Sequence, residues 1–277
     1  MPWLEELTWQ DARVAAEEAQ LAVWPVGATE QHGPHLRVAT DAAVAEAFAA
    51  RIVTDLGPAA IGLPPLRIGL SEHHLAFAGT LTLRPASFLA VVADVVESLA
   101  EWGPRRVLVV NGHGGNIDAL RIASRTAARD QGVELASVMW AQIAADVIAE
   151  HARSPSYGHA CEIETSVAMA LVPELVLGDR LVRGERYETV EGTMPPRTTV
   201  DRSTATDEWT ADGALGDPTL ADRALGETIR DVAEARMVAF ARRFAGLDDG
   251  RDETSDDEVS TRAVTNEQAP SRRRAER

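Results

Sequence analysis

Short apolar runs alternate along the chain with longer stretches in which apolar residues recur every three or four positions. The short runs predict buried strands, and the longer stretches predict amphipathic helices. Strands are expected at residues 21–27, 59–66, 105–112 and 133–140. Helices are expected at 41–56, 85–103, 116–132, 141–152, 160–171 and 220–245. Strands separated by helices of this length indicate an α/β fold with a mostly parallel central sheet between two helix layers.

The end of the chain breaks this pattern. After Leu247 almost no apolar residue follows, so the segment cannot bury enough surface to offset the entropy of ordering it. We therefore expect one domain over residues 1–247 and a disordered acidic and Arg-rich tail over 248–277. Residues 178–219 are rich in turn formers and predict loops with a short hairpin.

Charge and cysteine content narrow the class of protein. The chain has 43 acidic and 27 basic residues, a net charge of −16, which argues against nucleic acid as a partner. Its one cysteine, Cys161, excludes an intramolecular disulfide and favours a cytoplasmic protein. The first twenty residues do not resemble a signal peptide, and no apolar run approaches the roughly 18 residues of a membrane span.

Histidines are concentrated in a few polar motifs. Functional loops of open α/β sheets lie at the carboxyl ends of the strands, and two of these motifs follow predicted strands directly. Six of the seven histidines fall in the motifs "GATEQHGPH", "SEHHLAFAGT", "NGHGGN" and "GHACEIETS". This distribution indicates a site built from several loops.

The first motif has the composition of a divalent-metal site. Glu30 and His32 are two residues apart and would point to the same side of an extended chain. Asp41, at the start of the next helix, can reach back toward them, and carboxylates with an imidazole are suitable ligands. In the alternative interpretation, Asp41 only caps its helix and the other two are ordinary loop residues.

The motif "NGHGGN" strengthens the first interpretation. His113 follows a buried strand and is flanked by Gly112, Gly114 and Gly115, which allow the backbone to approach a ligand closely. The motif matches neither of the glycine-rich phosphate-binding patterns, and no Lys follows it. A ligand or catalytic role for His113 is the better explanation.

The motif "GHACEIETS" adds a further histidine and two carboxylates. His159 and Glu162 are three residues apart and would share a face of a helix, whereas Glu164 would point elsewhere. The alternative is that the carboxylates only stabilise the helix start. Cys161 is expected to be a buried structural residue, and the absence of a GxSxG motif argues against a serine hydrolase.

Together the four motifs resemble the signatures of the creatininase (creatinine amidohydrolase) family, in the right order and spacing over about residues 5–245. The resemblance implies a single α/β/α domain and hydrolysis of a non-peptide or unusual amide bond. It also implies two divalent metal ions per chain, usually zinc with a second zinc, manganese or iron, and a homohexameric assembly.

The resemblance also implies roles for individual residues. One metal would be held by Glu30 and His113, the other by His32, with Asp41 as the bridging carboxylate. His159 would be the acid/base histidine and Glu164 a supporting carboxylate.

One departure from the family pattern bears on substrate and metal binding. Enzymes that act on creatinine carry Tyr-Glu where this chain has Gly114 and Gly115, and that Glu completes the second metal site. We expect Glu162 to replace it, because a site with two protein ligands would be incomplete. Glu164 is the alternative if residues 160–165 are not helical.

The glycine version resembles family branches that act on other amides. One such branch cleaves the mycofactocin precursor peptide, and another deformylates a formamidopyrimidine. The expected substrate is a cyclic amide or formamide of a small molecule, contacted by Glu72, His73, Gly114 and Gly115. The alternatives are a peptidase acting on a cofactor-precursor peptide and a catalytically inactive metal-binding paralogue.

Overall fold

A parallel four-stranded sheet forms the centre of residues 1–247, which make one compact unit. The computed structural model describes residues 3–154, 157–184 and 204–247. The strand order is β2-β1-β3-β4, and all three strand pairs are parallel. The strands are β1 (Leu21–Val26), β2 (Ala60–Gly62), β3 (Arg106–Asn111) and β4 (Glu134–Met139).

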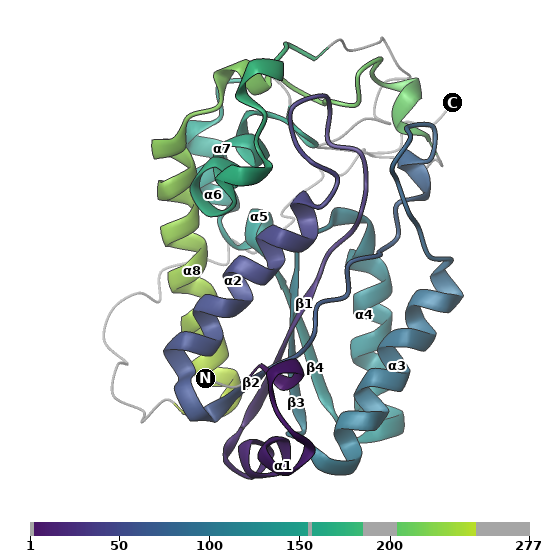
Figure 1. Ribbon diagram of the computed structural model, residues 1–277, viewed down its shortest axis with the longest axis vertical. Helices are drawn as coiled ribbons and strands as arrows, with labels where there is room; N and C mark the ends of the chain where they lie inside the picture. Colours follow the sequence, from purple (N-terminus) through teal and green to yellow (C-terminus); the bar gives the residue numbers. More distant parts are fainter. Residues whose placement is uncertain (1–2, 155–156, 185–203, 248–277) are drawn as a thin grey trace, which may run out of the picture. The chain divides into compact units, whose positions relative to one another are not determined.

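Helices cover both faces of the sheet (Figure 1). One layer contains α2 (Thr40–Leu56), α5 (Trp140–Ile143), α6 (Ala145–His151), α7 (Glu162–Leu171) and α8 (Arg223–Ala245). The other layer contains α3 (Pro85–Trp102) and α4 (Ile117–Thr126). The three-layer α/β/α fold expected from the sequence is therefore confirmed.

Two apolar cores follow from the alternation of side chains along the strands. Leu21 and Val23 of β1 pack in the core beneath α2 and α8. Ala22 and Trp24 point the other way, into the core beneath α3 and α4. Because both faces are covered, β1 is apolar at every position instead of alternating with polar residues.

The predicted elements agree with the structure, with four differences. The strand predicted at 59–66 is only three residues long, β2 (Ala60–Gly62). Helix α1 (Trp9–Glu18) was not predicted, and only Ala12 of this helix is buried. The segment predicted as one helix at 116–132 is α4 followed by a π-helical turn, η5 (Ala127–Gln131). The segment at 141–152 is divided into α5 and α6.

The loops contain short helical turns. The 3₁₀ turns are η1 (Leu4–Glu6), η2 (Gly57–Ala59), η3 (Glu72–His74), η4 (Gly114–Asn116), η6 (Pro173–Leu175), η7 (Gly178–Arg180), η8 (Thr206–Glu208) and η9 (Pro218–Leu220). The hairpin expected within 178–219 is not seen in the described part of that region, and the predicted tail at 248–277 lies outside the described residues. Among the helices that the structure describes, none has the length and apolar character of a membrane span.

The start of α2 is held against the carboxyl edge of the sheet. A Cβ placed on Gly27, just after β1, would lie 2.4 Å from the Cα of Ala42 in the first turn of α2. Only glycine permits this approach. Strands β1 and β3 end at the same edge, since Val26 pairs with Asn111. The chain segments that follow β1 and β3 therefore meet beside the first turn of α2.

Candidate metal centre

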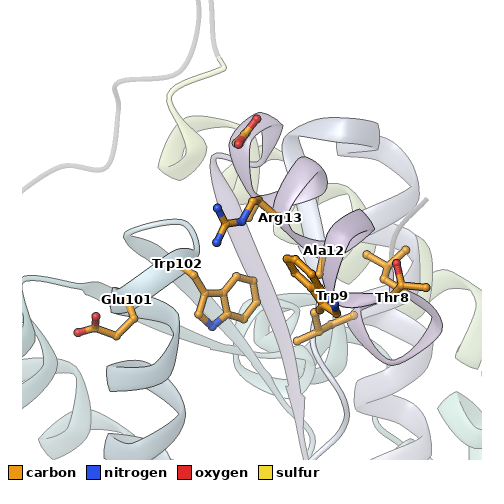
Figure 2. A pocket seen from close by; sticks show the side chains of 10 residues that line it. Thr8, Trp9, Ala12, Arg13, Glu101 and Trp102 are labelled. Atoms are coloured by element: carbon orange, nitrogen blue, oxygen red, sulfur yellow. The ribbon is translucent and has the colours of Figure 1, made fainter.

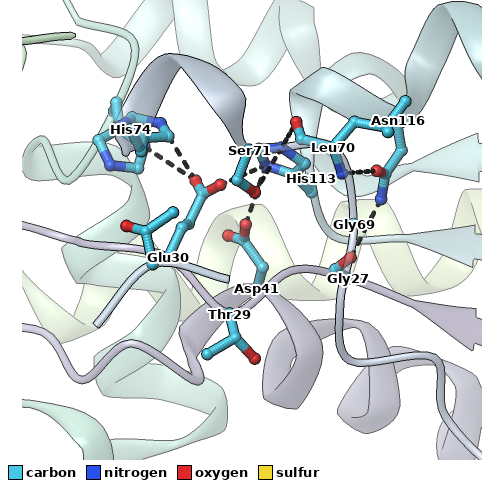
Figure 3. A network of polar contacts seen from close by, with 12 residues as sticks. Gly27, Thr29, Glu30, Asp41, Gly69, Leu70, Ser71, His74, His113 and Asn116 are labelled. Carbon is cyan, nitrogen blue, oxygen red and sulfur yellow. Dashed lines mark hydrogen bonds and ion pairs between the residues drawn. The ribbon is translucent and has the colours of Figure 1, made fainter. Parts of the chain in front are cut away.

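Buried acidic and histidine side chains converge at this edge (Figure 3). Glu30 follows β1, Asp41 lies in the first turn of α2, and His113 follows β3. All three are at most 4% exposed. The N-cap residue of α2 is Ala39, so Asp41 lies within the first turn and is not the cap. The structure thus favours the metal-site interpretation of this residue over the helix-cap alternative.

The first potential ligand set is Glu30, Asp41 and His113. The Nε2–H of His113 donates to the Leu70 carbonyl oxygen at 2.8 Å, which directs the other ring nitrogen toward the carboxylates. His113 Nδ1 lies 3.3 Å from Glu30 Oε2 and 3.1 Å from Asp41 Oδ2. Neither oxygen has a hydrogen-bond partner. With the His113 ring neutral and its proton on Nε2, three acceptor atoms face one another, an arrangement that a cation satisfies.

The second potential set is His32, Asp41 and Glu164, whose donor atoms lie within 4.8 Å of one another. His32 Nδ1 donates to the backbone oxygen of Glu30 at 3.2 Å, and its Nε2 lies 3.0 Å from Asp41 Oδ1. The two carboxylate oxygens of Asp41 therefore face different sets. This geometry suits a carboxylate that bridges two ions.

His159 lies between the two sets. Its Nε2–H donates to the Gln31 carbonyl oxygen at 2.8 Å, and its Nδ1 lies 3.7 Å from Glu30 Oε1 and 3.9 Å from Glu164 Oε2. These longer distances leave Nδ1 available for a proton. Glu30, His32 and His159 form a third possible ligand group.

A backbone turn brings Glu164 into the cluster. Ala160 has a φ of +47°, the one positive value at a non-glycine residue among those described. Its N–H donates to Glu164 Oε2. Such a conformation is unfavourable for alanine and is found mainly where the surrounding structure enforces it. The turn separates His159 from α7, which begins at Glu162.

The structure does not bring Glu162 to the cluster. Glu162 is fully buried, and its Oε1 accepts hydrogen bonds from the backbone N–H groups of Arg153 at 2.6 Å and Ser154 at 2.8 Å. The expectation that His159 and Glu162 share a helix face is wrong, because His159 precedes the helix. Glu164, the alternative, takes the position beside His32 that was expected for Glu162.

The metal-free cluster strongly perturbs its own ionisation. Burial alone would lower the pKa of His32, but the Asp41 carboxylate raises it to about 10. Burial also opposes the charge on His113, yet Glu30 and Asp41 raise its pKa well above the ordinary value. Burial raises the pKa of Glu164 to about 7. Burial and the nearby His32 lower the pKa of His159 to about 4.

Two asparagines support the first ligand set, as Figure 3 shows for Asn116. Asn116 accepts from the Leu70 N–H at 3.0 Å and donates to the Gly27 carbonyl at 3.1 Å. It thereby fixes the loop whose carbonyl holds His113. Asn111 donates to the His113 backbone oxygen at 2.7 Å. Metal-binding histidines are commonly oriented by partners of this kind.

Of the residues in "SEHH", the structure brings the second histidine into the cluster. His74 is buried, with Nε2 3.3 Å from Glu30 Oε1, whereas Glu72 is exposed. The expected substrate contact at Glu72 is not supported, because this residue does not line the cavity beside the cluster. The sequence signal was the repeated histidine itself. In a 3₁₀ turn, adjacent side chains point in different directions, and the sequence did not show which one points inward.

A cavity of about 250 Å³ opens beside the cluster. It is lined by Glu30, Asp41, His73, His74, Gly112, His113, Gly114, Gly115, Met139, Gly158, His159, Glu164, Trp209 and Leu215. Of the four expected substrate contacts, His73, Gly114 and Gly115 therefore line the cavity. Trp209 was not found from the sequence, since its loop is distant along the chain and has no regular pattern.

The glycine pair shapes this cavity. A Cβ on Gly115 would lie 2.2 Å from the Leu70 carbonyl oxygen, whereas one on Gly114 would meet nothing within 4 Å. A carboxylate side chain at position 115 would therefore require the loop carrying Leu70 to move.

A larger surface hollow of about 760 Å³ lies near α1 and the end of α3, where Trp9, Arg13 and Trp102 line it (Figure 2). No residue of the potential ligand sets described above lines that hollow.

Known proteins are similar to this chain in sequence and in fold. The family model for creatininase, described as creatinine amidohydrolase, matches residues 5–241. The chain is 37% identical over 212 residues to a mycofactocin precursor peptide peptidase of Mycolicibacterium smegmatis, covering 74% of this chain and 77% of that protein. It is 30% identical over 247 residues to a creatinine amidohydrolase of Pseudomonas putida, covering 82% and 91%.

Solved structures agree with these matches. A mutant creatininase of Zn–Zn type has a TM-score of 0.73 at 29% identity, covering 87% of this chain and 97% of that chain. A manganese creatininase has a TM-score of 0.71 at 29% identity, with coverage of 87% and 97%. The chain belongs to the creatininase family and is an amidohydrolase, an enzyme that hydrolyses carbon–nitrogen bonds.

Proposed function

We propose that the chain binds two divalent cations and uses them to hydrolyse an amide bond. Glu30 and His113 hold one cation, His32 and Glu164 hold the other, and Asp41 binds both. The observation that carries the proposal is the convergence of Glu30 Oε2, Asp41 Oδ2 and His113 Nδ1, three buried atoms that can all bind a cation once the His113 ring is neutral. Mixed carboxylate and imidazole sets accept zinc, manganese and iron, so zinc with a second ion of any of these types fits.

The chain's own groups have distinct tasks in this reaction. When bound, the cations lower the pKa of a water molecule and polarise the amide carbonyl. His159 keeps its Nε2–H on the Gln31 carbonyl, so Nδ1 is the nitrogen that accepts a proton and passes it to the leaving nitrogen. Glu164, 3.9 Å from Nδ1, stabilises the charge that His159 gains.

The favoured substrate is an amide bond of a peptide. The mycofactocin precursor peptide peptidases in the comparison are 33–37% identical to this chain, against 30% for the creatinine amidohydrolase. At the position of Gly114 the cavity has open space where a side chain would otherwise stand. A main chain can enter there and present its amide to the cluster.

A cyclic amide or formamide of a small molecule is the second candidate. The observation in its favour is the cavity volume of about 250 Å³, slightly below the usual 300–1,000 Å³ of small-molecule sites. In either case His73, Gly114 and Gly115 form the substrate wall. The family resemblance supports a homohexamer, and the single cysteine supports a cytoplasmic location.

Metal analysis and substrate assays test the proposal together. Purified protein reconstituted with zinc or manganese is expected to hold two ions per chain. It is then assayed against a creatinine, formamide and short-peptide panel, with hydrolysis followed by mass spectrometry. One ion or none would overturn the two-metal assignment and favour an inactive paralogue. Release of a peptide fragment, absent in His159→Ala protein, supports the peptidase assignment; hydrolysis of small amides alone would replace it with the second candidate.

A further inference from the structure

We propose that Gln31 fixes the tautomer of His74, so that His74 donates a hydrogen bond to Glu30 and positions this carboxylate without itself binding a metal. The proposal rests on the two-metal function, since Glu30 matters only as a ligand of a cation. It assigns roles to two buried residues between and beside the metal ligands, to neither of which the sequence analysis gave an individual role.

The orientation of the Gln31 side chain is determined by its backbone contacts. Oε1 accepts from the Gly33 N–H at 2.9 Å, and Nε2 donates to the Gly213 carbonyl at 3.1 Å. A flipped amide would place a donor against the N–H group and an acceptor against the carbonyl, losing both bonds. Nε2 is therefore the donor group. Its second hydrogen points to His74 Nδ1, 2.9 Å away.

This contact determines which nitrogen of His74 carries the proton. An amide nitrogen only donates, so His74 Nδ1 accepts and the proton of the neutral ring lies on Nε2. The Thr206 hydroxyl, 2.8 Å from Nδ1, can donate or accept and adds no constraint of its own. His74 Nε2–H then faces Glu30 Oε1 at 3.3 Å.

The two carboxylate oxygens of Glu30 therefore have different neighbours. His74 Nε2 lies 3.3 Å from Oε1, while Oε2 faces His113 and Asp41 with no hydrogen-bond partner of its own. A carboxylate held by one oxygen presents the other in a fixed direction. Outer partners of this kind change metal affinity by about 10- to 100-fold when they are removed.

Gln31 is also linked to the second half of the chain. A Cβ on Gly213 would lie 1.9 Å from Gln31 Oε1, so this position must be glycine for the amide to fit. Gly213 has a φ of +87°, which also favours glycine. The Gln31 carbonyl meanwhile accepts from His159. One residue therefore orients two histidines of the cluster, through different groups.

The tautomer can be measured in metal-free protein labelled with ¹⁵N-histidine. Long-range ¹H–¹⁵N spectra distinguish protonated from unprotonated ring nitrogens, and the His74 signals are assigned by their loss in His74→Phe protein. We expect a protonated Nε2 and an unprotonated Nδ1. Gln31→Glu should move the proton to Nδ1, since a carboxylate cannot donate, whereas Thr206→Val should leave it on Nε2. A proton on Nδ1 in the unaltered protein would overturn the proposal, whatever the variants do.

A double-mutant cycle tests the positioning role. Gln31→Met keeps the backbone carbonyl that holds His159 but removes the amide donor. Gln31→Met and His74→Phe are each expected to weaken zinc binding by about 10- to 100-fold in a chelator competition, and the double variant no further. Additive losses would show that Gln31 does not act through His74. A change of His74 from free to zinc-bound nitrogen signals on titration with zinc would show that it is a ligand.

These outcomes separate the inference from the function on which it rests. If the unaltered protein bound no metal, the two-metal function would fail while the tautomer of His74 could still be as expected. If it bound two metals with His74 in the other tautomer, the function would stand and this inference alone would be wrong.

Discussion

Gly112 and Asp41 approach each other so closely that no side chain fits between them. A Cβ on Gly112 would lie 2.1 Å from the Asp41 carbonyl oxygen, well inside van der Waals contact. The end of β3 is thereby packed directly on the first turn of α2. This packing carries the Asp41 carboxylate to the point where it meets both His32 and His113.

Gly112→Ala is expected to displace the start of α2 and to weaken metal binding together with stability. Overpacking of this kind costs roughly 1–3 kcal/mol of unfolding free energy. Gly114→Ala is the matched control for stability, because a Cβ there meets nothing within 4 Å. Urea unfolding with and without zinc measures both effects. Equal stability of the two variants would show that the contact at Gly112 relaxes without cost.

Asp41→Asn is expected to remove both cations. The amide is close in size to the carboxylate, but it carries no charge and can offer only one oxygen. Metal content after dialysis, measured by mass spectrometry, should fall from two ions per chain to nearly none, and activity should be lost. A variant that retains two ions and ordinary turnover would disprove the bridging role.

Glu164→Gln is expected to change metal content, whereas Glu162→Gln is expected to change stability. Glu164 lies with His32 and Asp41, so its replacement should leave one ion per chain and little activity. Glu162 accepts two backbone N–H groups, so its replacement should leave both ions in place and lower the melting temperature instead. Metal content and thermal unfolding of the two proteins give the comparison. Loss of an ion from the Glu162 variant alone would restore the role first expected for it.

His35 is expected to make the protein less stable in acid. Burial, together with the nearby His32, lowers the pKa of His35 from 6.5 to about 4 in the folded state. Between these values the unfolded chain binds a proton that the folded chain excludes. The stabilising contribution is therefore complete above pH 6.5 and is lost as the pH falls through 4, by roughly 3 kcal/mol in full.

The pH effect is measured by urea unfolding of metal-free protein at pH 7 and pH 5. His35→Gln removes the titrating ring while retaining a polar group near Thr165, which is 2.9 Å from His35 Nε2. The difference in stability between the two pH values should be smaller in this variant. An unchanged difference would show that other groups cause the acid sensitivity.

The sequence by itself determined the layers of the fold and most of the cluster. Strand β1 is apolar at every position, and β3 is apolar from Val107 to Val110, because both faces of the sheet are buried; that pattern is visible without coordinates. The carboxyl ends of parallel strands meet at one edge, so the motifs containing Glu30 and His113 could be expected to converge there. Those local signals, with the family resemblance, also singled out His32, Asp41 and His159.

Only the tertiary structure decided which further side chains join the cluster. Periodicity predicted that Glu162 would share a face with His159, but a single positive φ at Ala160 ends that relationship and brings Glu164 inward. Such a turn is enforced by packing from distant segments, and alanine gives no sign of it in the sequence. In the same way, Gln31 is an ordinary polar residue until folding places Gly213 and His74 against its amide. Contacts across such distances along the chain have no local pattern, so they exist only once the fold is formed.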